Sequence, residues 1–279
     1  MKYFVSSDIH GFFDEWMLAL KNSHFDINNP EHKIIVCGDL FDRGRQPKQI
    51  IDFIVSHRDK IMVIRGNHED LMQAMIYRNK NNSMDLSNGT AQTIVDLCPD
   101  WLISKFDLTE ITKETGLQEV LDLCVDYYET SKYVFIHGWI PIIENCYEYD
   151  ADWRTARKER WEKARWQNPV LMFRNKVFEP NKTIVCGHWH CSALWKEAYP
   201  TKYEEFGEKA NFEPFITKEM IALDACTAYS KKVNCIVLED WLTKVWIKSF
   251  FALLYTFAEI YDIILVLYVE VDYEIKSIR

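Results

Sequence analysis

Six short apolar runs recur along this chain, and most of them end in polar side chains. The runs read KYFVSSD, KIIVCGD, KIMVIRGN, KYVFIHG, KTIVCGH and MIALDA, and they are rich in Val and Ile, as buried strands are. Between the first three lie DEWMLALKNS and PKQIIDFIVSH, whose apolar residues repeat at the three- and four-residue steps of a helix. Strands that alternate with helices form crossover units, so the pattern predicts an α/β fold with an at least partly parallel sheet.

Five of the runs end in residue types that bind metal ions. These residues are Asp8 and His10, Asp39 and Asp42, Asn67 and His68, His137, and His188 and His190. Ligands of open α/β sheets bind beyond the carboxyl ends of the strands, which is where these side chains would lie. Each set taken alone also fits a turn or a helix cap. Because the sets follow separate strands in order, we predict one shared site.

The residue types indicate which ions this site would hold. Asp8 and His10 are two residues apart, as are His188 and His190, so each pair faces one side of an extended chain. Carboxylates, imidazoles and an amide suit Mn, Fe, Zn or Co better than calcium, which prefers oxygen ligands. The ligands are too many for one ion, and two divalent ions about 3.5–4 Å apart would use them. A water that bridges such ions is activated for attack on phosphorus, which predicts a hydrolase.

Composition narrows the class of protein. The 279 residues are 48% hydrophobic, enough for a substantial core, and the formal charge of −9 argues against sequence-independent binding of nucleic acid. The eight cysteines form no CxxC pair, and the first residues, MKYFVSSDIHG, lack the features of a signal peptide. We therefore expect a reducing compartment and a cytoplasmic location.

The predicted catalytic domain spans residues 1–240. It carries two insertions: residues 71–131, mostly helical with breaks near Asn88-Gly89 and Cys98-Pro99, and residues 139–181, rich in Trp, Arg and Glu. Residues 241–279 form an apolar C-terminal extension of unknown role. Glu259 and Asp262 lie near the centre of its apolar stretch, where a carboxylate costs roughly 2.5–3.5 kcal/mol on membrane-insertion scales. We therefore expect a packed helix there and no membrane span.

The ordered set DxH, GDxxDRG, GNHE, an isolated His-Gly and GHxH resembles the calcineurin-like metallophosphoesterases. The DRG and NHE elements resemble the branch that contains bacterial and phage serine/threonine phosphoprotein phosphatases and diadenosine tetraphosphatases. The second His of GHxH is more typical of the wider superfamily than of eukaryotic protein phosphatases. The resemblance implies a metallo-dependent phosphatase fold, a central β-sandwich of two sheets flanked by helices.

The resemblance also implies roles for the individual residues. Asp8, His10 and His190 would bind the first metal, Asp39 would bridge, and Asn67, His137 and His188 would complete the second site. His68 would protonate the leaving alcohol and be oriented by Asp42, since a nearby carboxylate favours the protonated imidazole. Arg43 would hold the phosphate oxygens through its planar fork of donors.

A second phosphate-binding arginine is expected between the His-Gly and GHxH motifs. The candidates are Arg154, Arg157, Arg160, Arg165 and Arg174. We favour Arg165, in KARWQNP, because an arginine beside Trp resembles the bacterial members. Glu69 and Asp70 are interpreted as the first turn of the next helix, where acidic residues favour the helix dipole.

The leading hypothesis for function is a two-metal phosphomonoesterase that uses a metal-bridging hydroxide. Its substrates would be phosphoserine or phosphothreonine proteins or simple phosphate esters, with Mn as the expected metal. One alternative is a diadenosine tetraphosphatase or another hydrolase of nucleotide anhydrides. The tryptophans of residues 139–181 would then stack on a base or, otherwise, pack as a lid: Trp139, Trp153, Trp161 and Trp166. The other alternative, an inactive scaffold, is disfavoured because every expected position is filled.

Overall fold

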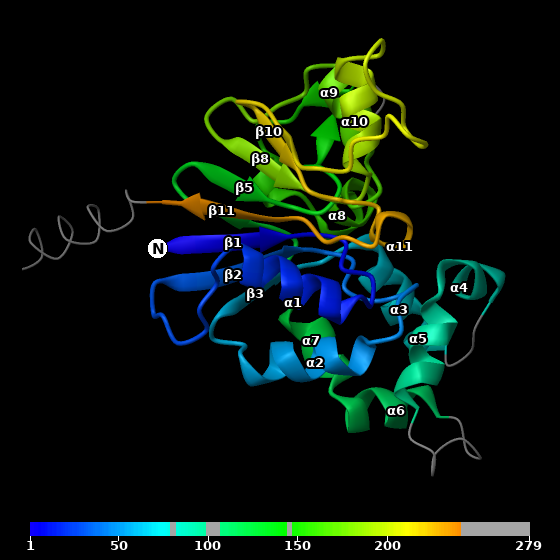
Figure 1. Cartoon of the computed structure of the whole chain (residues 1–279). Helices are drawn as coiled ribbons and strands as arrows, with labels where there is room; N and C mark the ends of the chain where they lie inside the picture. The colour runs from blue at the N-terminus through cyan, green and yellow to red at the C-terminus, as the bar shows by residue number, and fades with distance from the viewer. Residues whose placement is uncertain (79–81, 99–106, 144–146, 241–279) are drawn as a thin grey trace, which may run out of the picture. The chain divides into compact units, whose positions relative to one another are not determined.

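The computed structural model describes residues 1–78, 82–98, 107–143 and 147–240 (Figure 1). The first sheet has the order β11-β1-β2-β3, in which β1, β2 and β3 are parallel and β11 is antiparallel to β1. Its strands are β1 (Lys2–Ser6), β2 (His32–Cys37), β3 (Ile61–Ile64) and β11 (Cys235–Glu239). Parallel pairing brings the carboxyl ends of β1, β2 and β3 to one edge of the sheet.

The second sheet has the order β4-β5-β8-β10-β9, with parallel strands at its centre and an antiparallel strand at each edge. Its strands are β4 (Tyr128–Glu129), β5 (Tyr133–Phe135), β8 (Thr183–Cys186), β10 (Met220–Ala222) and β9 (Phe215–Ile216). A separate two-stranded sheet pairs β6 (Ile142–Ile143) with β7 (Glu148–Tyr149).

The two sheets face each other across a core made by alternating side chains. On β1, Val5 joins residues of the second sheet such as Val185 in one apolar cluster, whereas Phe4 belongs to the cluster beneath the helices of the first sheet. On β2, Ile35 faces inward and Ile34 outward in the same way. A period of two with both faces buried produces the continuous apolar runs of the sequence.

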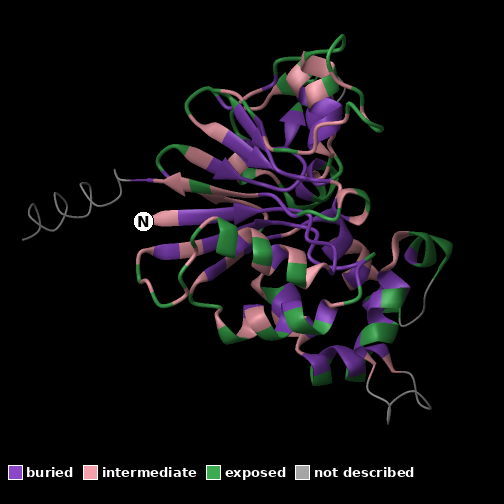
Figure 2. Ribbon diagram, viewed as in Figure 1, coloured by how far each residue is buried: buried purple, intermediate pink, exposed green. Residues whose placement is uncertain are grey.

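Helices cover the outer faces of both sheets (Figure 1, Figure 2). The first sheet carries α1 (Phe13–Asn22), α2 (Pro47–Ser56), α3 (Asn67–Arg78), α5 (Thr90–Leu97), α6 (Leu108–Thr115) and α7 (Leu117–Leu123). The second sheet carries α8 (Lys158–Ala164), α9 (Pro169–Arg174) and α10 (Cys191–Ala198). Three short elements complete the described fold: α4 (Ser83–Asn88), the 3-10 helix η2 (Trp153–Thr155) and α11 (Thr227–Ser230).

The structure confirms the predicted α/β class, the two-sheet sandwich and the six predicted strands, which are β1, β2, β3, β5, β8 and β10. The described part of residues 71–131 is helical up to Leu123, and Gly89 breaks it with a φ of 93°. The strand β11 is not among the six predicted strands. In the sequence its residues precede a long apolar stretch and do not stand out from it. Only the pairing with β1, more than 200 residues earlier in the chain, identifies β11 as a strand.

Residues 139–181 supply β6, β7, η2, α8 and α9. Trp139, Trp153 and Trp161 are buried in the apolar core of the second sheet, so they are available neither to stack on a base nor to form a lid, and Trp166 is half exposed. Met1–Glu239 form one compact unit, and the predicted extension 241–279 lies outside the described residues. Within the described ranges, no helix has the length and apolarity needed to cross a membrane.

The inward-facing side chains should dominate the stability of the sandwich. Ile35→Ala leaves a cavity between the sheets and should lower the free energy of unfolding by roughly 2–5 kcal/mol. Ile216→Ala is the matched control, because this isoleucine is 58% exposed and its loss should change stability by no more than about 0.5 kcal/mol. Urea denaturation of both variants measures the difference, and equal losses would contradict the packing described.

Candidate metal centre

Backbone hydrogen bonds tie the loops after the strands to one another. In the loops after β1 and β2, the amide of Asp8 donates to the carbonyl of Gly38 over 3.1 Å, and the amide of His10 to that of Asp39 over 2.9 Å. Across the second sheet, the amide of Gly187 donates to the carbonyl of His137 over 2.8 Å. These hydrogen bonds hold the loops against one another.

A buried carboxylate joins the loops after β2 and β3. Glu69 accepts hydrogen bonds from the amides of Asp39, Leu40 and Gly66, at 2.9, 2.9 and 2.8 Å. Burial and the neighbouring Asp39 raise the pKa of Glu69 to about 7, against the opposing effect of these three donors. Glu69 does lie in the first turn of α3, as predicted from the sequence. In addition to any effect on the helix dipole, it connects the loops after β2 and β3.

The loop backbones adopt conformations that L-residues rarely occupy. Six of the predicted site residues have positive φ angles: Asp8, His10, Asp39, Asp42, Arg43 and His188. Such residues carry a cost of order 1–3 kcal/mol each and persist where the surroundings determine them. Glycine is needed where loops touch: a Cβ on Gly187 would lie 2.1 Å from the Asp8 carboxylate, and one on Gly66 would lie 2.2 Å from that of Asp39.

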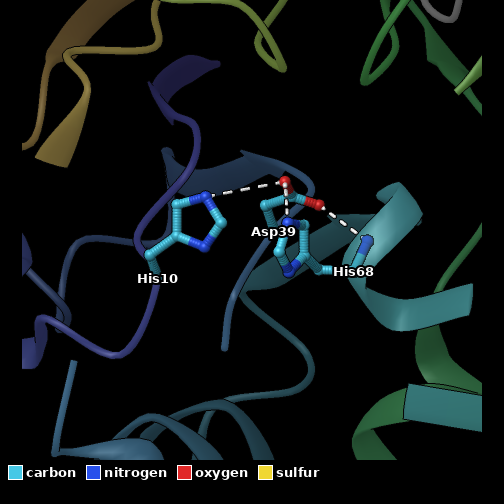
Figure 3. Close-up of side chains that lie close together, drawn as sticks. All are labelled: His10, Asp39 and His68. Atoms are coloured by element: carbon cyan, nitrogen blue, oxygen red, sulfur yellow. Dashed lines mark hydrogen bonds and ion pairs between the residues drawn. The ribbon is translucent and has the colours of Figure 1, made fainter. Parts of the chain in front are cut away.

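The Asp39 carboxylate lies beside the side chains of His10 and His68 (Figure 3). A second group, His137 and His188, lies near the same carboxylate. Its Oδ2 atom lies 3.6 Å from Nε2 of His10 and 3.9 Å from Nε2 of His68. Its Oδ1 atom lies 3.3 Å from Nε2 of His137. Asp39 with His10 and His68, and Asp39 with His137 and His188, each place ligand atoms within 4.8 Å of one another. One carboxylate oxygen is therefore directed to each group, the arrangement that a bridging ligand needs.

Three histidines are fixed with one ring nitrogen directed toward the centre. Nδ1 of His10 donates to the Phe41 carbonyl over 2.8 Å, and Nδ1 of His137 donates to the Cys37 carbonyl over the same distance. His188 similarly hydrogen-bonds the backbone of Trp166. Backbone acceptors of this kind orient metal-binding imidazoles and leave the other nitrogen as a lone pair.

The donor set fits divalent cations. Nε2 of His137 faces Oδ1 of Asn67 at 2.8 Å and Oδ1 of Asp39 at 3.3 Å, so three acceptor atoms converge. Asp8 and Asp39 are buried, and among the described residues no Lys or Arg forms an ion pair with either. Burying carboxylates without a cation is costly. Burial lowers the pKa of His10 and of His188 to about 3, so both imidazoles are neutral, as metal ligands must be.

His68 and Asp42 form a pair at the edge of the centre. Nδ1 of His68 lies 2.6 Å from Oδ2 of Asp42, which also accepts a hydrogen bond from the Thr90 hydroxyl at 2.8 Å. The Thr93 hydroxyl donates to the other oxygen of Asp42 at 3.0 Å. Burial lowers the pKa of His68, but Asp39 and Asp42 outweigh it and raise the pKa to about 9. Thr90 and Thr93 are not predicted from the sequence, because only the fold brings α5 beside Asp42.

The centre opens into a pocket of about 260 Å³. Seven predicted residues line it: His10, Asp39, Arg43, Asn67, His68, His188 and His190. Arg43 is exposed there, so its guanidinium faces the space in front of the carboxylates and imidazoles. Asn88, Trp166 and Trp189 complete one part of the wall.

Arg165 lies elsewhere than predicted. Its Nε and Nη2 atoms bind Asp70 at 2.6 and 3.2 Å, and its Nη1 binds Asp126 at 2.7 Å. The side chain is 3% exposed and is absent from the lining of the pocket. Two carboxylates already occupy the guanidinium, so we do not assign phosphate binding to Arg165.

The surroundings of His190 and the position of Asp224 add to the predicted site. Nε2 of His190 lies 3.0 Å from Glu205, so a carboxylate holds one of its ring nitrogens, and the other is available for a metal. Asp224 also lines the pocket, and it is not among the residues predicted from the sequence. It lies two residues after the end of β10 in the run MIALDA, the same signal that identified the other residues. Burial raises its pKa to about 6.

Comparison with known proteins identifies the family. The profile of the calcineurin-like phosphoesterases matches residues 1–192. The chain belongs to this family. Family members use a binuclear divalent metal centre, in agreement with the His and Asp groups described above. A crystal structure provisionally described as a diadenosine tetraphosphatase superposes with a TM-score of 0.50 at 15% identity, covering 85% of this chain and 89% of that one. This similarity supports the fold.

Curated relatives match shorter segments. A symmetrical bis(5'-nucleosyl)-tetraphosphatase of Buchnera aphidicola is 40% identical over 67 residues, which are 24% of this chain and 23% of the relative. An asymmetrical bis(5'-nucleosyl)-tetraphosphatase of Anoxybacillus flavithermus is 34% identical over 105 residues, 34% of this chain and 41% of the relative. The chain thus matches less than half the length of these relatives.

The bridging position of Asp39 can be tested by metal binding. We expect Asp39→Ala to weaken Mn²⁺ binding by more than the 10–100-fold that the loss of an outer-shell partner typically causes. Asp52→Asn, an exposed carboxylate on α2, should leave affinity unchanged. Electron paramagnetic resonance titration of free Mn²⁺ measures both. Equal affinity of Asp39→Ala and wild type would exclude Asp39 as a ligand.

The His68–Asp42 pair predicts a pH dependence of metal-free protein. A histidine pKa near 9 in the folded state, above the usual 6.5, contributes stability that is complete below pH 6.5 and lost as pH rises through 9. NMR of the imidazole in chelator-treated protein should show titration near pH 9. Asp42→Asn removes a cause of the raised pKa and should shift the titration lower, while an unchanged midpoint would contradict the pairing.

Proposed function

We propose that this chain is a metal-dependent phosphohydrolase that cleaves phosphate monoesters, with His68 as the general acid. The observation that supports this role is the His68–Asp42 pair at 2.6 Å, whose free nitrogen faces the centre beside Asp39. An alcohol is a poor leaving group unless a proton reaches its oxygen as the bond to phosphorus breaks. A positioned imidazole within hydrogen-bond reach supplies that proton.

The other residues of the pocket divide the remaining tasks. Following the family resemblance, Asp8, His10, Asp39 and His190 would hold one divalent ion, and Asp39, Asn67, His137 and His188 the second. The groups of converging ligand atoms among the described residues contain His10 and Asp39 with His68, and Asp39 with His137 and His188. When bound, such ions lower the pKa of water and neutralise charge on the phosphoryl oxygens. Arg43, exposed at the pocket, would bind the same oxygens through two parallel N–H donors. Asp42 keeps the His68 ring oriented and favours its protonated form.

Turnover of a simple ester tests the proposed activity. We expect hydrolysis of para-nitrophenyl phosphate when Mn²⁺ is added, with Fe²⁺, Zn²⁺ and Co²⁺ as the comparison series, and loss of activity with a chelator. The release of para-nitrophenolate measures the rate. A chain that binds Mn²⁺ but gives no turnover with any of these ions would be an inactive scaffold, and the proposal would be wrong.

The leaving group should reveal the task of His68. His68→Asn should retain both metals but hydrolyse phenyl phosphate about 10²–10⁴-fold more slowly, the usual contribution of a general acid. The loss should be smaller for para-nitrophenyl phosphate, because nitrophenolate leaves with less need of a proton. Metal content is the control. Loss of metal in His68→Asn would make His68 a ligand, which the cluster of His68 with His10 and Asp39 also permits.

A dinucleoside polyphosphate is the second candidate substrate. The relatives with the matching segments are named as bis(5'-nucleosyl)-tetraphosphatases, and two partly exposed tryptophans, Trp166 and Trp189, line the pocket. Initial rates on a phosphoserine peptide and on diadenosine tetraphosphate, measured side by side with Mn²⁺, decide between the two. A higher kcat/KM for the peptide supports the phosphoprotein candidate, and a higher value for the dinucleotide supports the other.

A further inference from the structure

A groove of about 980 Å³ adjoins the metal pocket. One wall is α3, the helix that begins with Asn67 and His68, and the other includes α8. Its lining includes apolar side chains, among them Leu71, Ala74 and Val125. Cavities of roughly 300–1,000 Å³ are typical of sites for small ligands. The proposed function does not assign an occupant to this groove.

Trp166 connects the groove to the metal pocket, since its side chain lines both. The indole is 50% exposed and lies edge-on to the His188 ring, with centroids 6.1 Å apart. Its backbone is held by two hydrogen bonds: His188 bonds to it, and its amide donates to the carbonyl of Lys163 over 3.1 Å. A half-exposed aromatic ring at the border of the metal pocket can stack on a flat group attached to a phosphate bound there.

The charges of the groove are paired with one another. Asp70 and Asp126 bind Arg165, Asp70 also lies 3.5 Å from Arg65, and Lys158 lies 3.7 Å from Glu162. The lining therefore holds three acidic and three basic side chains, each with a partner of opposite charge. Among the described residues that line the groove, every Lys and Arg has an acidic partner for which a further phosphate would compete. The groove thus favours an uncharged group with an apolar face and polar edges.

We propose that this groove binds the nucleoside of a phosphorylated nucleotide, with the base stacked on Trp166 and the phosphate at the metal centre. The inference rests on the proposed function, because the phosphate must occupy that centre. A nucleobase is flat, uncharged and polar at its edges, and it matches both the exposed ring and the paired polar side chains. The nucleotide relatives are consistent with this class of ligand.

Two phosphonates that resist hydrolysis separate the groove from the metal centre. Isothermal titration calorimetry of the Mn²⁺-loaded protein gives the affinities of methylphosphonate and of the phosphonate analogue of adenosine monophosphate. In wild type the adenosine should strengthen binding. Trp166→Ala should reduce that gain roughly 5- to 150-fold, since stacking on an aromatic side chain is worth about 1–3 kcal/mol per base. Trp166→Phe should retain most of the gain.

Trp195→Ala is the matched control, since this tryptophan on α10 lines neither cavity and should keep the full gain. Methylphosphonate binding by Trp166→Ala shows that the variant has folded. If methylphosphonate binds wild type but adenosine adds no affinity, or if Trp166→Ala keeps the gain, the inference is wrong while the proposed function stands. The inference would also be wrong if the binding of a phosphonate peptide depended on Trp166 while the binding of the adenosine phosphonate did not. No methylphosphonate binding and no turnover would instead refute the proposed function.

Discussion

A buried carboxylate that has no lysine or arginine partner among the described residues determines the organisation of this site. Asp39 is 2% exposed and directs one oxygen toward His10 and the other toward His137. Because backbone carbonyls bind the far nitrogen of both rings, the near nitrogens offer lone pairs to the same space. Such an arrangement is stable only with a cation nearby or with unusual support from the surroundings.

That support comes from the loops that carry these side chains. Glu69 accepts hydrogen bonds from three backbone amides in the loops after β2 and β3. The loops after β1 and β2 are also joined by backbone hydrogen bonds. The positive φ angles of Asp8, Asp39 and His188 are tolerated because the neighbouring backbone leaves each residue little alternative. The sandwich core beneath the loops fixes the distance between the sheets, so ligands from both sheets meet at one point.

The sequence predicted the strands well because burial on both faces leaves a continuous apolar run, as in KIIVCGD and KTIVCGH. The cluster of His10, Asp39, His137 and His188 could be anticipated for a related reason, since parallel strands bring their carboxyl ends to one edge. The environment of Arg165 could not be predicted, because sequence spacing does not show which acidic side chains bind an arginine. Its guanidinium binds Asp70 and Asp126, whose positions depend on α3 and on the segment after α7.

The sequence by itself determined which side chains follow which strand, since the apolar pattern and the order of motifs are local properties of the chain. It therefore determined the α/β class and the ligand types, whereas the sandwich and the acid candidate His68 followed from the family resemblance of the motifs. Only the tertiary structure decided which neighbours hold these groups: Thr90 and Thr93 beside Asp42, Glu205 beside His190, and Asp224 in the pocket wall. It also decided that Trp166 is exposed at the pocket while Trp139, Trp153 and Trp161 are buried. Burial and pairing depend on residues distant in sequence, and no local pattern records them.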